Sequence, residues 1–183
     1  EAAWEYAAVQ ESANVLDIGT GSGCLAIAIA SQANQVDVHA LDISREALGV
    51  ARANANRHGL GDCIVFHEVD MRQDCPIDGT HDLVVSNPPY IPTGEIETLQ
   101  EEVSEHDPRL ALDGGEDGLD YYRSLVVNYL PCLRTGGRLM LEVGDGQASK
   151  VSDLIIKHGG QVLEILPDLN NVERIVIASP SNS

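Results

Sequence analysis

The sequence has little basic charge. Its 183 residues include 11 Lys and Arg against 29 Asp and Glu, so the formal net charge is −18. Lys150 and Lys157 are its only lysines, and no cluster of basic residues occurs. Proteins that hold a nucleic-acid backbone neutralise its phosphates with basic side chains. We therefore expect no stable nucleic-acid binding by this segment, although solubility alone explains the acidity equally well.

Long apolar runs and a secretory signal are lacking as well. The longest uninterrupted apolar stretch covers residues 24–30, whereas a membrane-spanning helix needs roughly 18 or more apolar residues. No basic leader followed by an apolar segment opens the chain, so we expect no membrane span and a cytoplasmic protein. Because the chain begins with Glu1 rather than Met, we also expect a fragment or a trimmed form of a longer protein.

The four cysteines form no metal or redox motif. Cys24, Cys63, Cys75 and Cys132 include no C-x-x-C pair, and no His stands at zinc-ligand spacing from any of them. We expect four reduced thiols and no metal site. The six histidines are scattered, and none pairs with a Ser or Cys in a way that suggests a nucleophile.

What is present is the pattern of one α/β domain, in which apolar runs alternate with amphipathic stretches. The polar stretch 91–117 is long enough to predict a functional loop, with helical turns over 95–103. Ser44 is a candidate N-cap, and Gly136 and Gly137 are expected to end the third helix. We predict one doubly wound, mostly parallel sheet with strands over 14–18, 36–41, 63–69, 83–86, 138–143, 161–166 and 174–178, and helices over 24–32, 44–58, 119–133 and 147–158.

Alternating glycines mark the first candidate site. Residues 19–23 read Gly-Thr-Gly-Ser-Gly between the first expected strand and the first expected helix, where glycine lets a ligand touch bare backbone. Asp42 closes the second strand, where a carboxylate can accept both hydroxyls of a ribose. The nicotinamide fingerprint needs a further glycine where Cys24 stands, so the pattern favours S-adenosylmethionine. A tight turn that binds nothing is the alternative.

The second candidate site is the tetrapeptide Asn87-Pro88-Pro89-Tyr90, which follows a short apolar strand. Ligands of open parallel sheets bind beyond the carboxyl ends of the strands, so this segment is expected beside the glycine turn. The two prolines stiffen the chain and lack N–H donors. The Asn87 side-chain oxygen and the Pro88 carbonyl can each accept one N–H of a planar amino group, and Tyr90 can stack on its face. Such fixing of the reactants predicts methyl transfer to nitrogen, with an ordinary Pro-Pro turn as the alternative.

These motifs resemble the methyltransferase domain of the HemK/PrmC type, the N5-glutamine methyltransferases of peptide chain release factors. The matching segments at 15–28 and 87–92 occur in many amino-group methyltransferases, including those that act on adenine in nucleic acids, whereas the matching segment at 107–119 is more specific. The matches run in family order: VLDIGTGSGCLAIA at 15–28, NPPYIP at 87–92, DPRLALDGGEDGL at 107–119, and LEVG at 141–144 followed by Gln147.

The resemblance implies a class I, Rossmann-like fold whose seven-stranded sheet has an antiparallel last strand. It implies transfer of a methyl group from S-adenosylmethionine to the side-chain amide of the glutamine in the Gly-Gly-Gln motif of release factors. Family members usually carry a helical N-terminal domain that helps to recognise the release factor. This chain lacks that domain, so residues 1–183 are expected to be a single catalytic domain. The implied substrate-gripping residues are Asn87, Pro88, Pro89 and Tyr90, and the implied cofactor-binding residues are Gly19, Thr20, Gly21, Ser22, Gly23, Asp42, Asp70, Met71 and Asn87.

Other functions stay open at this point. An N6-adenine methyltransferase would use the same chemistry, but the net charge of −18 counts against it. A nicotinamide-dependent oxidoreductase is opposed by the Cys24 position, and a non-catalytic adaptor that retains the pocket is a third alternative. Arg109, Glu116 and Asp117 either contact substrate or belong to a lid shaped by glycines. Glu142 is either functional or caps backbone N–H groups.

Overall fold

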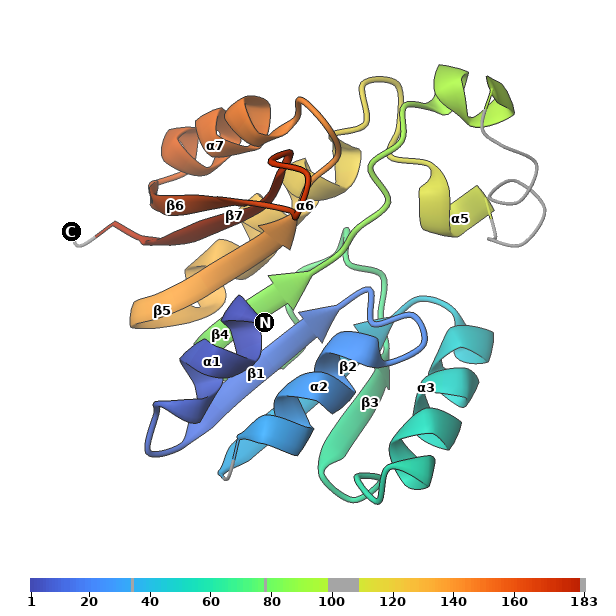
Figure 1. Ribbon diagram of the computed structural model, residues 1–183, viewed down its shortest axis with the longest axis vertical. Helices are drawn as coiled ribbons and strands as arrows, with labels where there is room; N and C mark the ends of the chain where they lie inside the picture. Colours follow the sequence, from blue (N-terminus) through green and yellow to red (C-terminus); the bar gives the residue numbers. More distant parts are fainter. Residues whose placement is uncertain (34, 78, 99–108, 182–183) are drawn as a thin grey trace.

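The computed structural model describes residues 1–33, 35–77, 79–98 and 109–181. Within these residues one sheet has the strand order β3-β2-β1-β4-β5-β7-β6 (Figure 1). β7 is antiparallel to both of its neighbours, and the other neighbouring strands pair in parallel. The doubly wound fold and its antiparallel last strand are thus confirmed. The strands are β1 (Ala13–Ile18), β2 (Val36–Asp42), β3 (Ile64–Glu68), β4 (His81–Ser86), β5 (Leu133–Glu142), β6 (Gly160–Pro167) and β7 (Glu173–Pro180).

Helices cover both faces of the sheet. Apolar residues of α1, α2 and α3 pack on one face, and those of α6 and α7 pack on the other. The short helices η1 and α5 lie beyond the carboxyl ends of the strands, at the upper right of Figure 1. The helices are α1 (Ala2–Ala8), α2 (Cys24–Gln32), α3 (Arg45–Arg57), η1 (Thr93–Thr98), α5 (Arg109–Leu112), α6 (Asp120–Tyr129), η2 (Leu130–Cys132) and α7 (Ala148–Lys157).

Burial of apolar side chains holds this frame together. On the α6 face, Tyr122, Leu125 and Tyr129 are fully buried against the sheet, and each large side chain of this kind contributes roughly 1.5–3 kcal/mol when buried. Every residue of β4 is buried, as expected for a central parallel strand covered on both faces. The central strands therefore form a rigid support for the loops at their carboxyl ends.

Local sequence signals begin two helices as predicted. The Ser44 hydroxyl accepts a hydrogen bond from the Ala47 N–H at 3.2 Å and caps α3. α2 begins at Cys24, directly after Gly23, whose φ of 85° is in the left-handed region that favours glycine. The turn that precedes α2 therefore depends on glycine at this position.

The helix expected to run to Leu133 is wrong in its last turn. α6 ends at Tyr129, and the chain continues as η2 because Pro131 lacks the N–H that an α-helix would need. Gly136 and Gly137 do not stop a helix but lie inside β5. A Cβ at Gly137 would lie 3.0 Å from neighbouring carbonyl oxygens, so glycine permits close backbone approach there.

Two further segments were not predicted in full. No helix was expected at the N-terminus, yet α1 packs Ala7 against the sheet although its N-cap makes no side-chain hydrogen bond. Of the helical turns expected over 95–103, η1 forms the described part, and residues 99–103 lie outside the described residues. Residues 107 and 108, which begin the third matching segment, also lie outside them.

The described residues contain neither a helix that could span a membrane nor a cluster of metal ligands. None of the helices there combines the length and the apolarity that a bilayer crossing requires. No group of three or more His, Cys, Asp or Glu side chains there could hold a metal ion. All four cysteines are free.

Candidate active site

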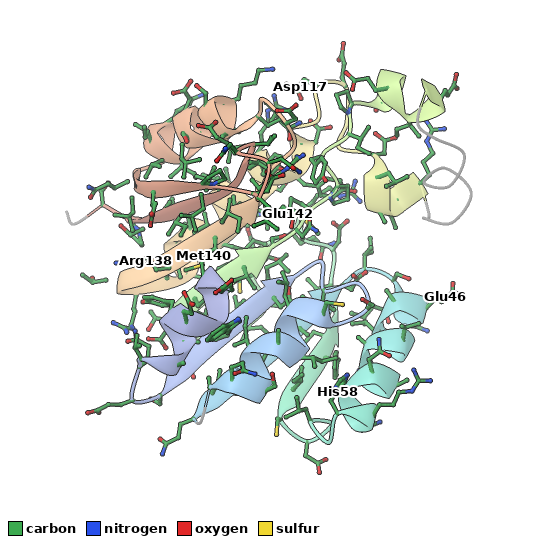
Figure 2. The ribbon with its side chains drawn as sticks, in the orientation of Figure 1. Glu46, His58, Asp117, Arg138, Met140 and Glu142 are labelled. Atoms are coloured by element: carbon green, nitrogen blue, oxygen red, sulfur yellow. The ribbon has the colours of Figure 1, made fainter. Side chains whose placement is uncertain are left out.

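The strand register brings four sequence-predicted positions into one row. Ile18 of β1 pairs with Leu41 of β2 and with Ser86 of β4, and Ser86 pairs with Leu141 of β5. Neighbouring strands lie about 4.8 Å apart. The residues that follow these positions therefore stand side by side at the carboxyl edge of the sheet, in the order Asp42, Gly19, Asn87 and Glu142. Figure 2 shows Glu142 at this end of β5.

The glycine turn is fastened to β2 and leaves part of its backbone bare. The Gly19 N–H donates to the Leu41 carbonyl at 2.8 Å, and the Gly21 N–H donates to Asp42 Oδ2 at 2.9 Å. Gly21 has a φ of 56°, and a Cβ added there would meet nothing within 4 Å. The turn is thus built, and an open space adjoins it where a ligand can approach the backbone.

Asp42 has capacity for a further ligand. One of its oxygens accepts from the Gly21 N–H and the other accepts from the Ser44 N–H at 2.8 Å. An ionised carboxylate offers about four acceptor sites, so about two remain. The carboxylate is only half-buried. It can therefore accept the two hydroxyls of a ribose, as predicted for this position.

Asp17 is a site residue that the sequence reasoning missed. It is fully buried beneath the glycine turn, and its Oδ2 accepts from the Thr20 hydroxyl at 2.6 Å and from the Ala26 N–H at 3.0 Å. Its Oδ1 is buried and has no hydrogen-bond partner among the described residues. Burial raises the pKa of Asp17 to about 6. An acidic residue inside an apolar strand, two positions before a glycine turn, was the available signal.

The loop after β3 reaches the glycine turn. A Cβ added to Gly19 would lie 2.7 Å from the Met71 methyl group, so Met71 covers this part of the turn. The Asp70 carboxylate forms an ion pair with Arg72 at 2.7 Å, which lowers the pKa of Asp70. Ser22 is exposed, and its hydroxyl lies 3.2 Å from the Cys24 thiol. Of the two predicted residues in the loop after β3, Met71 is the one that the packing places against the turn.

The Asn87–Tyr90 segment presents a free amide beside a fixed tyrosine. Asn87 is exposed and its side chain makes no hydrogen bond within the described part of the chain, whereas Pro88 is buried. The Tyr90 carbonyl accepts a hydrogen bond from Gln147 Nε2 at 2.8 Å. Burial, aided by the nearby Glu142, raises the pKa of the Tyr90 hydroxyl. The segment therefore has one exposed polar end and one anchored end.

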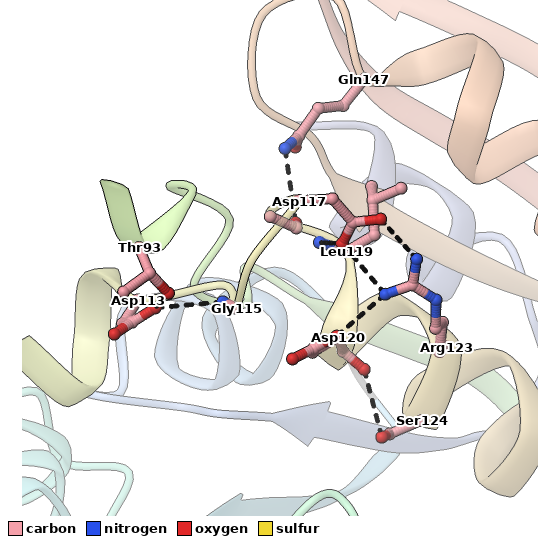
Figure 3. Close-up of polar contacts among 10 residues, drawn as sticks. Thr93, Asp113, Gly115, Asp117, Leu119, Asp120, Arg123, Ser124 and Gln147 are labelled. Atoms are coloured by element: carbon pink, nitrogen blue, oxygen red, sulfur yellow. Dashed lines mark hydrogen bonds and ion pairs between the residues drawn. The ribbon is translucent and has the colours of Figure 1, made fainter. Parts of the chain in front are cut away.

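The loop rich in acidic residues is docked onto the chain that follows Tyr90. The Ile91 N–H donates to the Leu112 carbonyl at 3.0 Å, and the Ile91 carbonyl accepts from the Gly114 N–H at 2.8 Å. Asp113 accepts from the Thr93 hydroxyl at 2.6 Å and from the Gly115 N–H at 3.1 Å (Figure 3). These contacts give the loop a defined shape against the chain that follows the Asn87–Tyr90 segment.

Two of the charged residues with open roles form ion pairs, one within this loop and one with α6. Arg109 pairs with Asp113 at 3.5 Å, and Asp117 pairs with Arg123 at 2.5 Å. Glu116 is exposed. Arg109 and Asp113 border a hollow of about 470 Å³, whose other lining residues are Arg72, Thr93, Leu110, Gly115, Asp120 and Tyr121.

Glu142 is half-buried, and burial raises the pKa of its carboxyl group. Its carboxylate accepts no backbone hydrogen bond within the part of the chain that the structure describes. Its main-chain carbonyl accepts from the Tyr122 hydroxyl at 2.9 Å. The structure thus gives no support to the capping role.

The sheet topology, the glycine turn after β1 and the acidic side chain after β2 together define the class I S-adenosylmethionine-dependent methyltransferase fold. The chain superposes on ribosomal protein L11 methylase from Lactobacillus delbrueckii subsp. bulgaricus with a TM-score of 0.73 and 21% identity, covering 99% of this chain and 76% of that one. It also superposes on magnesium protoporphyrin IX methyltransferase from Synechocystis, solved with bound S-adenosylmethionine, with a TM-score of 0.63 and 18% identity, covering 93% and 71%.

The chain belongs to the methyltransferase small domain family, whose profile matches residues 5–116. One relative, a release factor glutamine methyltransferase from Geobacter sulfurreducens, is 44% identical over 165 residues, which are 90% of this chain and 57% of the relative. A second of the same name, from Chlorobaculum tepidum, is 42% identical over 167 residues, with 90% and 56% covered. The chain spans somewhat more than half the length of these relatives.

Proposed function

We propose that residues 1–183 form a catalytic domain that transfers a methyl group from S-adenosylmethionine to the glutamine side-chain amide of the Gly-Gly-Gln motif in peptide chain release factors. The observation that carries this proposal is the exposed, unengaged amide of Asn87, next to Gly19 in the strand register. The relatives named as release factor glutamine methyltransferases support the choice of substrate.

The cofactor fits the residues around the glycine turn. Asp42 would accept the ribose hydroxyls, and the bare backbone at Gly21 would adjoin the methionine part. The unpartnered Oδ1 of Asp17 is a buried acceptor suited to a cationic group. Met71 and Asp70 would border the adenine, as the family resemblance implies. When bound, S-adenosylmethionine supplies a methyl group on a sulfonium, which is already activated for transfer.

The Asn87–Tyr90 segment would hold the nitrogen that receives the methyl group. An amide nitrogen is a poor nucleophile because its lone pair is delocalised into the carbonyl. The Asn87 side-chain oxygen and the Pro88 carbonyl would accept its two N–H bonds, which orients the nitrogen and concentrates electron density on it. The methyl–sulfur bond of the donor would break, with its electron pair left on sulfur, as the N–C bond forms, and one of these two protons would then pass to water. Tyr90 would stack on the planar amide.

The charge of the chain favours a protein substrate over nucleic acid. With a net charge of −18 the segment has no general attraction for phosphates, so an adenine substrate is less well supported. An acidic protein attracts basic protein partners at low ionic strength. We also propose a cytoplasmic location, where release factors act.

The test is mass spectrometry of a release factor incubated with this chain and S-adenosylmethionine. We expect one added methyl group on the glutamine of the Gly-Gly-Gln tripeptide. A release factor with glutamate in place of that glutamine is the control and should gain no methyl group. Methylation of adenine in DNA or RNA under the same conditions, without methylation of the release factor, would contradict the proposal.

A further inference from the structure

The Gln147 side-chain amide is buried at the centre of the loops that surround Tyr90. Gln147 is only 8% exposed, and its Nε2 donates to the Tyr90 carbonyl at 2.8 Å and to the Gly118 carbonyl at 3.4 Å. Its Oε1 accepts from the Gly144 N–H at 3.0 Å and from the Tyr122 hydroxyl at 3.5 Å. A neutral amide offers two donors and two acceptor sites, and all of them are used.

The hydrogen bond from Gln147 Nε2 to the Tyr90 carbonyl anchors the main chain of the Asn87–Tyr90 segment. Pro88 and Pro89 have no N–H to donate. Within the described residues, the contact from Gln147 is the only hydrogen bond made to any atom from Asn87 to Tyr90. Removing it would leave this segment held by packing and by the bonds of Ile91 alone.

The residues around the Gln147 side chain are packed closely enough to fix the orientation of its amide group. A Cβ at Gly118 would collide with the Tyr90 carbonyl oxygen and lie 2.6 Å from Gln147 Nε2. A Cβ at Gly144 would lie 2.8 Å from Gln147 Oε1 and 2.9 Å from Tyr90 Cδ2. Glycine at both positions therefore allows the loops that carry Tyr90, Gly118 and Gly144 to pack against the Gln147 side chain. Figure 3 shows Gln147 reaching from the start of α7 toward the loop that carries Asp117.

Capping of its own helix does not explain Gln147. It occupies the N-cap position of α7, yet its side chain makes no capping hydrogen bond there. All four of its bonds lead away from the helix to Tyr90, Gly118, Gly144 and Tyr122. The side chain therefore serves the loops at the sheet edge rather than the helix that it precedes.

We propose that Gln147 is a positioning residue. Its hydrogen bond to the Tyr90 carbonyl fixes the orientation of the Asn87–Tyr90 backbone. That backbone in turn aligns the Asn87 side-chain oxygen and the Pro88 carbonyl, the two acceptors that hold the substrate amide. This inference rests on the proposed function. It predicts a specific kinetic pattern, because the side-chain hydrogen bonds of Gln147 go to Tyr90, Gly118, Gly144 and Tyr122 and to none of the residues assigned to the cofactor. Loss of its two N–H donors should lower kcat and leave cofactor binding unchanged.

The test compares Gln147→Met and Gln147→Glu with a matched control. Both variants keep approximately the side-chain length and lose both N–H donors. Ile155→Val removes one fully buried methyl group from the same helix and destabilises α7 without touching Tyr90. We expect kcat of both Gln147 variants to fall at least about tenfold, with affinity for S-adenosylhomocysteine within about threefold of the parent. Ile155→Val should retain the parent kcat.

A second readout does not depend on activity. The Ile91 N–H donates to the Leu112 carbonyl at 3.0 Å, so its hydrogen exchange reports on the backbone just after Tyr90. It should exchange faster in Gln147→Met than in the parent and in Ile155→Val, at a temperature well below unfolding. If the parent chain itself transfers no methyl group, the proposed function fails and this exchange comparison still decides whether Gln147 holds the segment.

Any of three results would overturn the inference. The first is a folded Gln147→Met variant with the parent kcat. The second is unchanged exchange of the Ile91 amide in that variant. A fall in kcat that Ile155→Val reproduces at matched loss of melting temperature would likewise assign the effect to general destabilisation.

Discussion

Three polar side chains near the strand ends differ in burial, and their burial separates their roles. Asp17 is fully buried and bonded to the turn and to α2. Asp42 is half-buried and fastens the turn while retaining free acceptor sites. Asn87 is exposed and makes no hydrogen bond among the described residues. These differences in burial agree with the proposed roles, in which the first two support the cofactor and Asn87 holds the substrate amide.

Asn87→Ala should separate binding from transfer. The Asn87 side chain has no hydrogen bond to lose within the described residues, so affinity for S-adenosylhomocysteine should change by less than about threefold. Removing one oriented acceptor should lower the rate of methyl transfer by about 10²–10³-fold, in line with the loss of a single aligned dipole in other active sites. Calorimetry and single-turnover methyl transfer measure the two effects. Turnover at the parent rate would disprove the assigned role.

Asp17→Asn should change how stability depends on pH. Burial raises the pKa of Asp17 from 3.8 to about 6, so between these values the native state binds more protons than the unfolded state. The free energy of unfolding contributed by this group therefore falls as pH rises from about 4 to about 6. The Asp17→Asn variant has no titrating group at this position. Its free energy of unfolding relative to that of the parent should therefore increase as pH rises from about 4 to about 6, by at most about 3 kcal/mol.

Urea unfolding at pH 4, 5, 6 and 7 measures this difference. Asp153→Asn, which changes an exposed carboxylate on α7, is the control and should show no comparable trend. A constant difference between Asp17→Asn and the parent across the four pH values would contradict a raised pKa of the buried Asp17 carboxyl group.

At the residue level, sequence reasoning located side chains whose position follows from strand ends. Asp42 and Asn87 each follow an apolar strand, and parallel strands end at one edge, so their grouping could be predicted. Asp17 lies inside a strand, where the sequence shows only a charged residue among apolar neighbours. Its desolvation arises from α2 and the turn packing over it, and that packing is a tertiary property.

At the level of elements, two glycines with similar backbone torsions provide a matched pair. Gly118 has a φ of 73° and Gly159 a φ of 82°, so alanine at either position costs roughly 1–2 kcal/mol of left-handed strain. At Gly159 a Cβ would meet nothing within 4 Å, whereas at Gly118 it would collide with the Tyr90 carbonyl oxygen. Gly118→Ala should therefore displace the Asn87–Tyr90 segment.

We expect Gly159→Ala to retain the parent kcat and Gly118→Ala to lose at least about tenfold. Gly118→Ala should also lose more stability than Gly159→Ala in urea unfolding, because the collision adds to the shared strain. Equal kcat values for the two variants would show that the packing of Gly118 on Tyr90 has no effect on the reaction.

The elements that were predicted correctly carry periodic apolar patterns bounded by capping or turn residues, as α2 and α3 do. The errors fall where local signals compete. The pattern of apolar residues continued beyond Tyr129, yet Pro131 ended the helix and β5 took up Gly136 and Gly137. The docking of the loop around Gly114 on Ile91 depends on backbone hydrogen bonds between distant residues, which no local pattern encodes.

At the scale of the whole molecule, the site is assembled from the ends of four strands rather than from one segment. β2, β1, β4 and β5 are neighbours in the sheet, and each contributes the residue that follows its position in the paired row of Leu41, Ile18, Ser86 and Leu141. A ligand that spans this row contacts segments distant in the sequence and thereby links them. Its binding should stabilise the native state as a whole, because the unfolded chain has no such row.

This linkage distinguishes the cofactor classes that the glycine turn alone leaves open. A ligand at 100 times its dissociation constant stabilises the native state by about 2.7 kcal/mol. For a chain of this size each kcal/mol raises the melting temperature by about 2–4 °C, so saturating S-adenosylhomocysteine should raise it by about 5–10 °C. NAD should give no shift, since Cys24 stands where its fingerprint needs glycine.

Asp42→Ala should abolish most of the S-adenosylhomocysteine shift, because the variant loses the ribose acceptor and the Gly21 contact together. A shift with NAD that exceeds the shift with S-adenosylhomocysteine would reverse the assignment of the site.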